Sequence, residues 1–409
     1  MNDQLTLTEE FKQALPVFER LTEAGYEAYF VGGSVRDALL GLPVNDVDIA
    51  TSARPEEVKA LFEKTVDIGI EHGTVLVMEG DNHYEITTYR TESTYKDFRR
   101  PDSVSFVRSL KEDLKRRDFT INAIAIDKEG NITDLFNGIE DLNKKIIRAV
   151  GDPNERFHED ALRMMRAVRF AAQLGFEIDD NTLKAMKDQV SLLEKIAVER
   201  INIEWIKLLT SKARKRGLEA VIETKLYEYC PELANKKMAL VYLANGEKRI
   251  DSERIAWSLL LYYIRYMQPR AYQENIASFL RQWKTSNQMI EDVKTIVLGM
   301  EERLKTKTLD PYLIFNYGLD LSLDVEEALS HVNKELSNPE KVVTIYTELP
   351  IHSRDDLDLS GHDLMTHFAK KPGPWLGEAI TLAEEKVIRK EWPNDKETLL
   401  KYLEAIFNQ

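Results

Sequence analysis

The chain has 409 residues, of which 43% are hydrophobic and 31% are charged, an ordinary composition for a soluble globular protein of roughly two to four domains. No apolar run approaches the roughly 20 residues that span a bilayer, and the single cysteine, Cys230, excludes an internal disulfide framework and fits a reducing cytoplasm. The net charge of −14 argues against a globally basic nucleic-acid binder, but it leaves room for a local basic groove.

The first 150 residues mix helix and strand signals, and the pattern changes after Gly151. Residues 6–25 have a helical pattern that ends at Gly25. Apolar, β-branched or alternating runs predict strands at residues 26–31, 46–51, 73–78, 83–89 and 119–127. From Pro153, which follows a suitable N-cap at Asp152, nearly every segment is helical in pattern. We therefore expect an α/β head followed by an all-α region.

The stretch FVGGSVRDALLG (30–41) predicts a strand, a Gly-Gly turn and a helix that begins near Ser34. Gly32 and Gly33 let a ligand come close to the backbone, and the helix N-terminus offers free N–H groups to an anion. Arg36 lies in the first turn, where a cation is unfavourable against the helix dipole. A bound phosphate would explain this arginine, and pairing with a nearby acid is the ordinary alternative.

Two aspartates, Asp46 and Asp48, lie in the run PVNDVDIATS (43–52). On a strand they point the same way, with Cα atoms about 7 Å apart. Mg²⁺ is usually held by one or two carboxylates together with substrate phosphates. The alternative is a strand at a sheet edge with both acids in solvent, but the preceding Gly-Gly turn favours the metal interpretation.

A third acid is needed if two metal ions clamp a phosphoryl transfer. Glu85, in HYEITTYR, is the first candidate, and Asp118, in KRRDFTINA, is the rival. His72 and His83 are expected to be structural or exposed, because Mg²⁺ has little use for imidazole.

Residues 155–176, ERFHEDALRMMRAVRFAAQLGF, predict one amphipathic helix. Asp160 and Arg163 are three residues apart and would share a face, with Glu159 adjacent and with Arg166 and Arg169 continuing the stripe. An aspartate that only accepts and an arginine that only donates can read a base edge, and the other arginines would hold a triphosphate. The alternative is a set of Asp–Arg pairs on the wet side of the helix.

These stretches together resemble the class II tRNA nucleotidyltransferases, the CCA-adding enzymes of the polymerase β-like nucleotidyltransferase superfamily, and in particular those of low-GC Gram-positive bacteria. The resemblance is dense over roughly residues 25–210, where VGGSVRDALLG, DVDIATSARPEEV, RRPDSVSFVRSLKEDLKRRDFTINAIA, DPNERFHEDALRMMRAVRFAAQLGF and ERINIEW each look like a family motif. It is thinner beyond, although KKPGPWLGEAI (370–380) resembles the family's tail.

The resemblance implies that Asp46 and Asp48 hold the catalytic Mg²⁺, with Glu85 nearby. The residues that it implies in nucleotide binding are Gly33, Arg36, Arg117, Asp160, Arg163, Arg166 and Arg169. Among them, Asp160 and Arg163 would act as the amino-acid template that pairs with CTP and then with ATP.

The implied activity is addition of CCA to the 3′ end of tRNA from CTP and ATP, without a nucleic-acid template and with release of pyrophosphate. The implied architecture is a head with a polymerase β-like sheet (1–150), followed by an all-α neck (151–215), body (216–320) and tRNA-binding tail (321–409). The resemblance further implies a homodimer, and the composition predicts a cytoplasmic protein without membrane association. Basic clusters at 96–101, 115–117 and 212–216 are candidate tRNA contacts or, equally, solvated surface runs.

Three alternatives remain open from the sequence. A bacterial poly(A) polymerase shares the head fold, but it is expected to carry a basic, aromatic stretch where this chain has KTVDIGIEHGTVLV (64–77). An enzyme that adds only CC or only A is disfavoured, because relatives that add only CC lack a flexible loop between the two head motifs. This chain keeps that loop as TESTYKDFRRPDSVSFVRSLKED (91–113). A non-catalytic RNA-binding protein would have no need for the aspartate pair.

Overall fold

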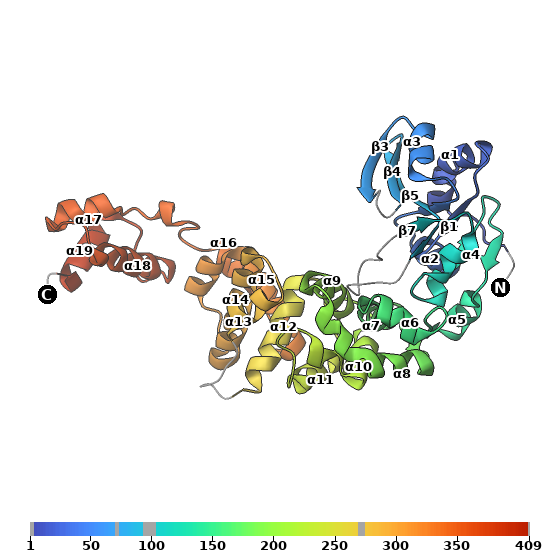
Figure 1. The fold of residues 1–409 in the computed structure, drawn as a ribbon. Helices are drawn as coiled ribbons and strands as arrows, with labels where there is room; N and C mark the ends of the chain where they lie inside the picture. Colours follow the sequence, from blue (N-terminus) through green and yellow to red (C-terminus); the bar gives the residue numbers. More distant parts are fainter. Residues whose placement is uncertain (1–3, 70–72, 93–103, 269–274, 408–409) are drawn as a thin grey trace. The chain divides into compact units, whose positions relative to one another are not determined.

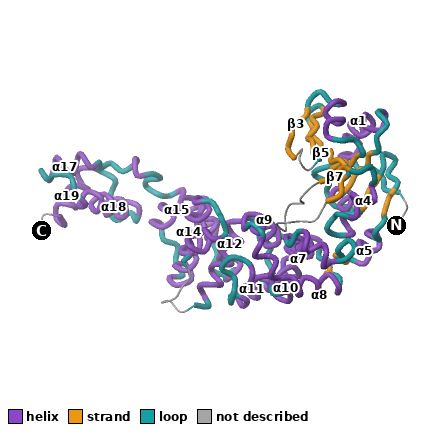
Figure 2. The backbone as a smooth tube through the Cα atoms, viewed as in Figure 1, coloured by secondary structure: helices purple, strands orange, loops and turns teal. Residues whose placement is uncertain are grey.

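The computed structural model describes residues 4–69, 73–92, 104–268 and 275–407. The chain divides into two compact units, Met1–Asn245 and Gly246–Gln409. Among the described residues, strands occur only in the first unit (Figure 1; Figure 2, orange). The predicted order of an α/β region followed by helices is therefore confirmed, whereas the division into head, neck, body and tail stays a prediction.

A seven-stranded sheet, in the order β3-β4-β5-β2-β1-β8-β9, forms the centre of the N-terminal part. Its strands are β1 (Ala28–Val31), β2 (Asp48–Thr51), β3 (Thr65–Gly69), β4 (Thr74–Glu79), β5 (Asn82–Thr88), β8 (Ile124–Ile126) and β9 (Ile132–Asp134). Strands β2 and β5 run parallel, and the other neighbouring pairs are antiparallel. The runs predicted at 26–31, 46–51, 73–78 and 83–89 are confirmed as β1, β2, β4 and β5.

One face of this sheet is closed by α1 (Glu9–Glu23) and α3 (Pro55–Leu61) (Figure 1). On β1, the Phe30 ring lies 5.0 Å from Phe11 and 4.8 Å from Phe18 of α1, measured between ring centroids. Ile49 and Ile86 continue the Phe30 row on β2 and β5 and are fully buried. Burial of these large apolar side chains supplies the main favourable free energy of this part.

The opposite face carries a second row of side chains, which runs from β1 to the edge strand β3. In order, the row is Val31, Asp48, Glu85, Leu76 and Val66. At its β1 end Val31 is buried in a cluster that includes Tyr89 and Leu114. Farther along, Asp48 and Leu76 are half-buried, and Glu85 and Val66 are exposed. Among the described residues, this face is therefore covered over β1, and its side chains become more exposed over β5, β4 and β3.

The strand predicted at 119–127 is wrong in its first half. Thr120–Asn122 form a 3₁₀ turn, and β8 covers only Ile124–Ile126. The reason is local hydrogen bonding, because the Asp118 carboxylate accepts from the Phe119 backbone N–H and from the Asn122 side chain. Side-chain capture of this kind competes with strand pairing.

The single helix predicted over 155–176 is two helices, α6 (Pro153–Glu159) and α7 (Leu162–Leu174). Asp160 lies between them in an extended conformation, with φ −142° and ψ 103°. Its carboxylate accepts a hydrogen bond from the Leu162 backbone N–H at 3.0 Å. Asp160 therefore acts at the start of α7, where an acidic side chain satisfies a free N–H group, and the argument that Asp160 shares one helical face with Arg163 is wrong.

The remaining elements of the first unit are mostly helical, as predicted near Ser34 and after Gly151, whereas the helices at 110–115 and 138–144 were not predicted. They are α2 (Gly33–Leu39), α4 (Leu110–Lys115), α5 (Gly138–Lys144), α8 (Asp180–Gln189), α9 (Val198–Leu209), α10 (Arg214–Thr224) and α11 (Lys237–Asn245). Two small sheets pair β6 (Arg90–Glu92) with β7 (Val104–Phe106) and β10 (Ile146–Ile147) with β11 (Glu177–Ile178). These four short strands, together with β3 and β9, were not predicted.

The described residues of the second unit form helices joined by turns and loops. Its helices are α12 (Glu253–Tyr266), α13 (Ile276–Gln282), α14 (Asn287–Thr306), α15 (Pro311–Val332), α16 (Pro339–Thr347), α17 (Gly361–Phe368), α18 (Pro374–Ile388) and α19 (Lys396–Phe407). Helix α15 is kinked at Gly318, which has φ 73°. In the described part of the chain, no helix has both the length and the apolar character that a membrane span requires.

Candidate active site

The turn between β1 and α2 brings backbone close to two charged side chains. Gly32 has φ 79°, a conformation that favours glycine. A Cβ atom at Gly32 would lie 3.2 Å from Arg117 Nη1 and 3.5 Å from Asp48 Oδ2. Helix α2 begins at Gly33, so the predicted strand, Gly-Gly turn and helix are confirmed. The glycine is required here because the backbone, an arginine and an aspartate converge.

Asp48 is the first residue of β2, and it pairs in register with Val31 on one side and with Glu85 on the other. The pKa of Asp48 is raised to about 6. Burial is the main cause, the charges of Glu85 and Asp46 also raise this pKa, and Arg117 lowers it. Asp46 lies just before the strand and is exposed. Two neighbouring acids thus act electrostatically on Asp48.

The two candidates for a third carboxylate have different surroundings. Glu85 is exposed beside Asp48, and its side chain faces solvent because the neighbouring Tyr84 and Ile86 are buried on the other face. Asp118 is buried and bonds Arg166 Nε at 2.7 Å. Burial alone would raise the pKa of Asp118, but Arg166 holds it well below its usual range. The placement therefore favours Glu85 as the acid next to Asp48 and gives Asp118 an ion-pair role.

Arg36 is buried on α2, and its guanidinium is held from two sides. It pairs with Asp37 at 2.7 Å, and its Nη1 donates to Asn122 Oδ1 at 2.7 Å. The ordinary alternative for this residue, pairing with a nearby acid, is thus what the structure contains. The same pairing also fixes the guanidinium in place, as an anion site requires.

Arg116 and Arg117 are fixed by one buried acid, Asp113 of α4. The carboxylate lies 2.8 Å from Arg116 and 3.2 Å from Arg117. Burial alone would raise the pKa of Asp113, but the two guanidinium groups hold it below its usual value. This charged trio orders the basic segment that precedes Asp118.

Asp160 and Arg163 each have a different partner from the one the sequence suggested. Asp160 pairs with Arg200 of α9 at 2.8 Å. Arg163 pairs with Glu159 at 2.6 Å and donates to the backbone carbonyl of Arg116 at 3.0 Å. Both side chains are therefore held in place by neighbours.

Arg166 and Arg169 of α7 meet Glu204, a buried residue of α9. Glu204 lies 2.6 Å from Arg169 and 3.8 Å from Arg166. The Phe170 ring also lies against these arginines, with the guanidinium carbon 3.7 Å from its centroid for Arg169 and 5.3 Å for Arg166. A buried charge network and a ring face thus position both guanidinium groups.

One cavity of about 440 Å³ unites these side chains. Six arginines and three aspartates line it, together with the turn glycines: Gly32, Gly33, Arg36, Asp48, Arg116, Arg117, Asp118, Asn122, Asp160, Arg163, Arg166, Arg169, Phe170 and Gln173. All seven residues predicted for nucleotide binding belong to this lining; Asp46 and Glu85 do not. In a chain whose net charge is −14, this local excess of arginine suits a polyphosphate.

Comparisons with known proteins place the chain in a family. Three family models match the chain: the poly A polymerase head domain (residues 28–148), the probable RNA- and SrmB-binding site of polymerase A (175–237) and a putative tRNA nucleotidyltransferase domain 2 (248–403). A protein of Enterococcus faecalis named CCA-adding enzyme is 51% identical and covers 97% of this chain and 96% of its own length. The chain belongs to the CCA-adding enzyme family.

Two further relatives support the assignment to this nucleotidyltransferase family. A CCA-adding enzyme of Ligilactobacillus salivarius is 46% identical over 98% of both chains. The crystal structure of the Bacillus stearothermophilus CCA-adding enzyme in complex with CTP is 39% identical, covers 98% of each chain and has a TM-score of 0.90. The expected family, the fold class and the enzyme class are confirmed.

Several residues of the site in this CCA-adding family member were not predicted from the sequence. They are Arg116, Asn122, Phe170 and Gln173 in the cavity, and Asp113, Arg200 and Glu204 behind it. Glu204 and Arg200 lie in the stretch ERINIEW, which we recognised as a motif without assigning its residues. A buried acid at helical spacing was the signal that could have identified Glu204.

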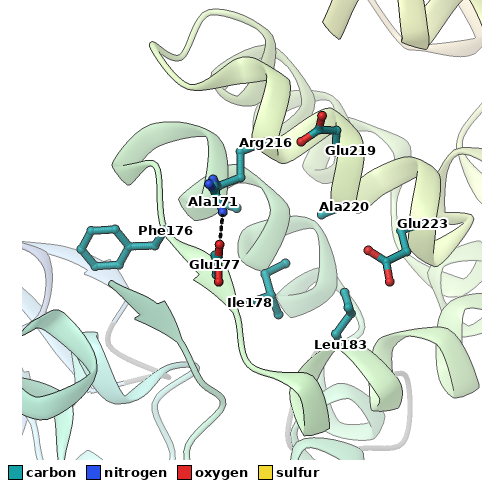
Figure 3. A pocket seen from close by; sticks show the side chains of 9 residues that line it. All are labelled: Ala171, Phe176, Glu177, Ile178, Leu183, Arg216, Glu219, Ala220 and Glu223. Atoms are coloured by element: carbon teal, nitrogen blue, oxygen red, sulfur yellow. Dashed lines mark hydrogen bonds and ion pairs between the residues drawn. The ribbon is translucent and has the colours of Figure 1, made fainter. Parts of the chain in front are cut away.

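The basic clusters predicted as tRNA contacts have mixed outcomes. Residues 96–101 and His72 lie outside the described residues, and Arg116 and Arg117 point into the cavity. In 212–216, Arg214 is buried and donates to the Leu243 carbonyl. Arg216 pairs with Glu177 at 2.9 Å in a second cavity of about 210 Å³, whose lining includes none of the residues predicted for metal or nucleotide binding (Figure 3). Arg214 is therefore structural.

Proposed function

We propose that Asp48 and the arginine cavity beside it form the active site with which this chain adds CCA to the 3′ end of tRNA. CTP and ATP are the substrates, pyrophosphate is released, and no nucleic-acid template takes part. The observation that carries this proposal is the single cavity, in which the turn glycines, Asp48 and six arginines converge. The relatives that share nearly the full length of the chain are named CCA-adding enzymes.

The triphosphate would occupy the arginine-rich part of the cavity. Arg36, Arg117 and Arg166 already have fixed positions through ion pairs and hydrogen bonds. Fixed guanidinium groups bind phosphate oxygens with little loss of side-chain entropy on binding. The free N–H groups at the start of α2 would add further donors.

Asp46 and Asp48 fit a divalent cation, in keeping with a family whose members use such a metal. Carboxylate oxygens are the donors that Mg²⁺ prefers, and one or two of them together with substrate phosphates are the usual protein-side ligands. Among the described residues, no group of three or more His, Cys, Asp or Glu side chains has the arrangement of a metal site, so substrate oxygens would complete the coordination. The cation would supply stabilisation of charge on the attacking and leaving oxygens.

The reaction joins the 3′ oxygen of the RNA to the α-phosphorus of the nucleotide. The bond from the α-phosphorus to the bridging oxygen of the β-phosphate breaks, pyrophosphate leaves, and the hydroxyl proton is released to solvent. Asp48 marks the reacting end because it lies between the arginine cavity and the open face of the sheet. The arginines would neutralise the charge that develops on the leaving pyrophosphate.

Asp160 and Arg163 would select the base. An aspartate accepts from the exocyclic amine of cytosine or adenine, and an arginine donates to a ring nitrogen or carbonyl oxygen. To do so, each side chain must exchange part of its present pairing, with Arg200 or with Glu159, for the base. The two present partners lie on different elements, α9 and α6, which would allow a different arrangement for each nucleotide.

The rest of the proposal concerns the wider protein. We place the head at 1–150, the neck at 151–215, the body at 216–320 and a tRNA-binding tail at 321–409, with recognition of tRNA by its backbone and shape. We further propose Mg²⁺ as the cation, a homodimer, and a cytoplasmic location. The last fits Cys230, a buried thiol whose pKa burial raises to about 12 and which is therefore poorly reactive.

A primer-extension gel tests the activity. The substrates are tRNA ending before CCA, tRNA ending in CC, and an unstructured RNA, each with Mg²⁺ and CTP, ATP or both. Addition of C, C and A followed by a stop, on tRNA only, is expected. A long ladder of A on any RNA would instead mark a poly(A) polymerase, and addition of C only or of A only would mark an enzyme with a partial activity.

A further inference from the structure

The open part of the sheet continues beyond the carboxylates as an apolar surface. Glu85 pairs in register with Leu76 of β4, and Leu76 pairs with Val66 of the edge strand β3. Because neighbouring strands lie about 4.8 Å apart, the backbones of Leu76 and Val66 are about 10 and 14 Å from that of Asp48. We call Val66 and Leu76 the ledge.

The side chains of the ledge face the open side of the sheet. Asp67 pairs with Lys59 of the covering helix α3 at 2.9 Å, so it points to the covered face. Its neighbour Val66, which pairs in register with Leu76, points away from that helix. Val66 and Ile68 are each 49% exposed. On β4, Val75 and Val77 are fully buried and flank the half-buried Leu76, so Leu76 faces the open side as well.

Asp48 therefore lies between two surfaces of opposite character. On one side is the arginine cavity, which suits the phosphates of a nucleotide. On the other side are Glu85 and then the ledge. The Glu85 carboxylate would repel a phosphate, and the two ledge side chains carry no charge that would attract one. An uncharged group, such as a ribose or the flat face of a base, can pack there and lose contact with water.

The reaction brings a second substrate to Asp48, the 3′ end of the RNA, and its terminal base changes after every addition. A contact that reads hydrogen bonds would favour one terminal base over the others. Apolar packing against a base face accepts every base, because each has the same kind of flat surface. The ledge has the chemistry that such a changing end requires.

We propose that Val66 and Leu76 bind the ribose and base of the 3′-terminal nucleotide of the acceptor RNA and thereby direct its 3′-hydroxyl toward Asp48. This proposal rests on the role given above to Asp48. It assigns the ledge to the RNA substrate and the arginine cavity to the nucleoside triphosphate, so the two substrates approach Asp48 from opposite sides.

The double variant Val66→Ala/Leu76→Ala tests this assignment by steady-state kinetics. The KM for tRNA ending before CCA is expected to rise about tenfold, which corresponds to about 1.4 kcal/mol. The KM for CTP is expected to stay within about twofold, because the loss concerns binding of only one substrate. The rise should be similar for tRNA ending before CCA and for tRNA ending in C. Since both side chains are partly exposed, the variant should keep a cooperative thermal transition.

Ile68→Ala is the matched control. Ile68 is as exposed as Val66 and lies on the same strand, but outside the row that leads to Asp48. Its KM for tRNA should change clearly less than that of the double variant.

Three results would overturn the proposal. One is an unchanged KM for tRNA in the double variant. Another is an equal rise of KM for tRNA and for CTP, which indicates general damage. The third is a change of oligomeric state in sedimentation with both KM values unchanged, which assigns the exposed edge strand to a second copy of the chain. Asp48→Asn is measured in parallel. If Asp48→Asn stays active, the role given to Asp48 is rejected. If Asp48→Asn is inactive and the double variant keeps the parent KM for tRNA, only the role of the ledge is rejected.

Discussion

Glu204 is predicted to be the principal support of the arginines on α7. It is buried, and it is the acid that pairs with Arg169 at 2.6 Å while also reaching Arg166 at 3.8 Å. Glu204→Gln keeps the size of the side chain but removes its charge, and the buried Arg169 then loses its ion-pair partner. Removal of one partner of a buried ion pair typically destabilises a protein by about 3–5 kcal/mol. For a unit of this size, each kcal/mol lowers the Tm by about 2–4 °C, so the expected fall is about 6–20 °C.

The assay is thermal unfolding of Glu204→Gln by circular dichroism, with and without CTP and Mg²⁺. Glu177→Gln is the matched control, because Glu177 pairs with Arg216 at 2.9 Å on an exposed surface, where such pairs contribute about 0–1 kcal/mol. Since a bound triphosphate replaces the lost negative charge beside Arg169, CTP should raise the Tm of Glu204→Gln more than that of the parent protein. An unchanged Tm in Glu204→Gln, or a fall no larger than that of the control, would refute the reasoning.

Three further outcomes are expected. Asp160→Ala and Arg163→Ala should blur the choice among CTP, ATP, GTP and UTP in single-nucleotide incorporation, and unchanged selectivity would reject their base-reading role. Arg166 lowers the pKa of Asp118 in the folded protein, so their ion pair stabilises the fold above the unfolded pKa of about 3.9, and this contribution is lost as the pH falls. The difference in free energy of unfolding between the parent and Asp118→Asn should therefore shrink below about pH 4. A difference that stays constant with pH in urea unfolding would contradict this. Gly32→Ala should lower stability by about 1–3 kcal/mol, because its positive φ is strained for alanine; an unaltered urea midpoint would argue against the required turn.

Much of the site was predictable because its residues lie in short segments with regular geometry. The alternation of a strand placed Asp48 among apolar neighbours, and it also indicated Glu85 as an acid within another strand. What the sequence could not supply was the pairing between strands. The parallel register of β2 with β5, which puts Glu85 directly beside Asp48, joins residues separated by a helix and two further strands.

The helix break at Asp160 shows a different limit. The hydrophobic pattern continues through 155–176, so periodicity alone favours one helix. The outcome depends on a local competition, in which the Asp160 carboxylate bonds the start of α7 and Arg200 of α9 pairs with it. Arg200 is 40 residues away in sequence, so no local pattern around Asp160 predicts this ion pair.

The arginines of α7 show why charge counting along a sequence can mislead. Within the segment 155–176, three arginines, Arg163, Arg166 and Arg169, stand against few acids. This count predicts a surplus of positive charge, yet each arginine has a carboxylate partner. The partners of the last two, Asp118 and Glu204, come from elsewhere in the fold. The surplus is instead a property of the cavity surface, which receives arginines from α2, the segment after α4, and α7.

The most direct test of the proposed active site is single-turnover addition of C to tRNA ending before CCA, with the parent chain and with Asp48→Asn, combined with CTP binding by each. We predict that Asp48→Asn loses C addition by at least about a thousandfold, since removal of a group that acts in the transition state lowers the rate and not ground-state binding. Its affinity for CTP should stay within about tenfold, because the arginine cavity is intact. Normal C addition by Asp48→Asn would contradict the assignment of Asp48 and its cavity as the site of nucleotidyl transfer.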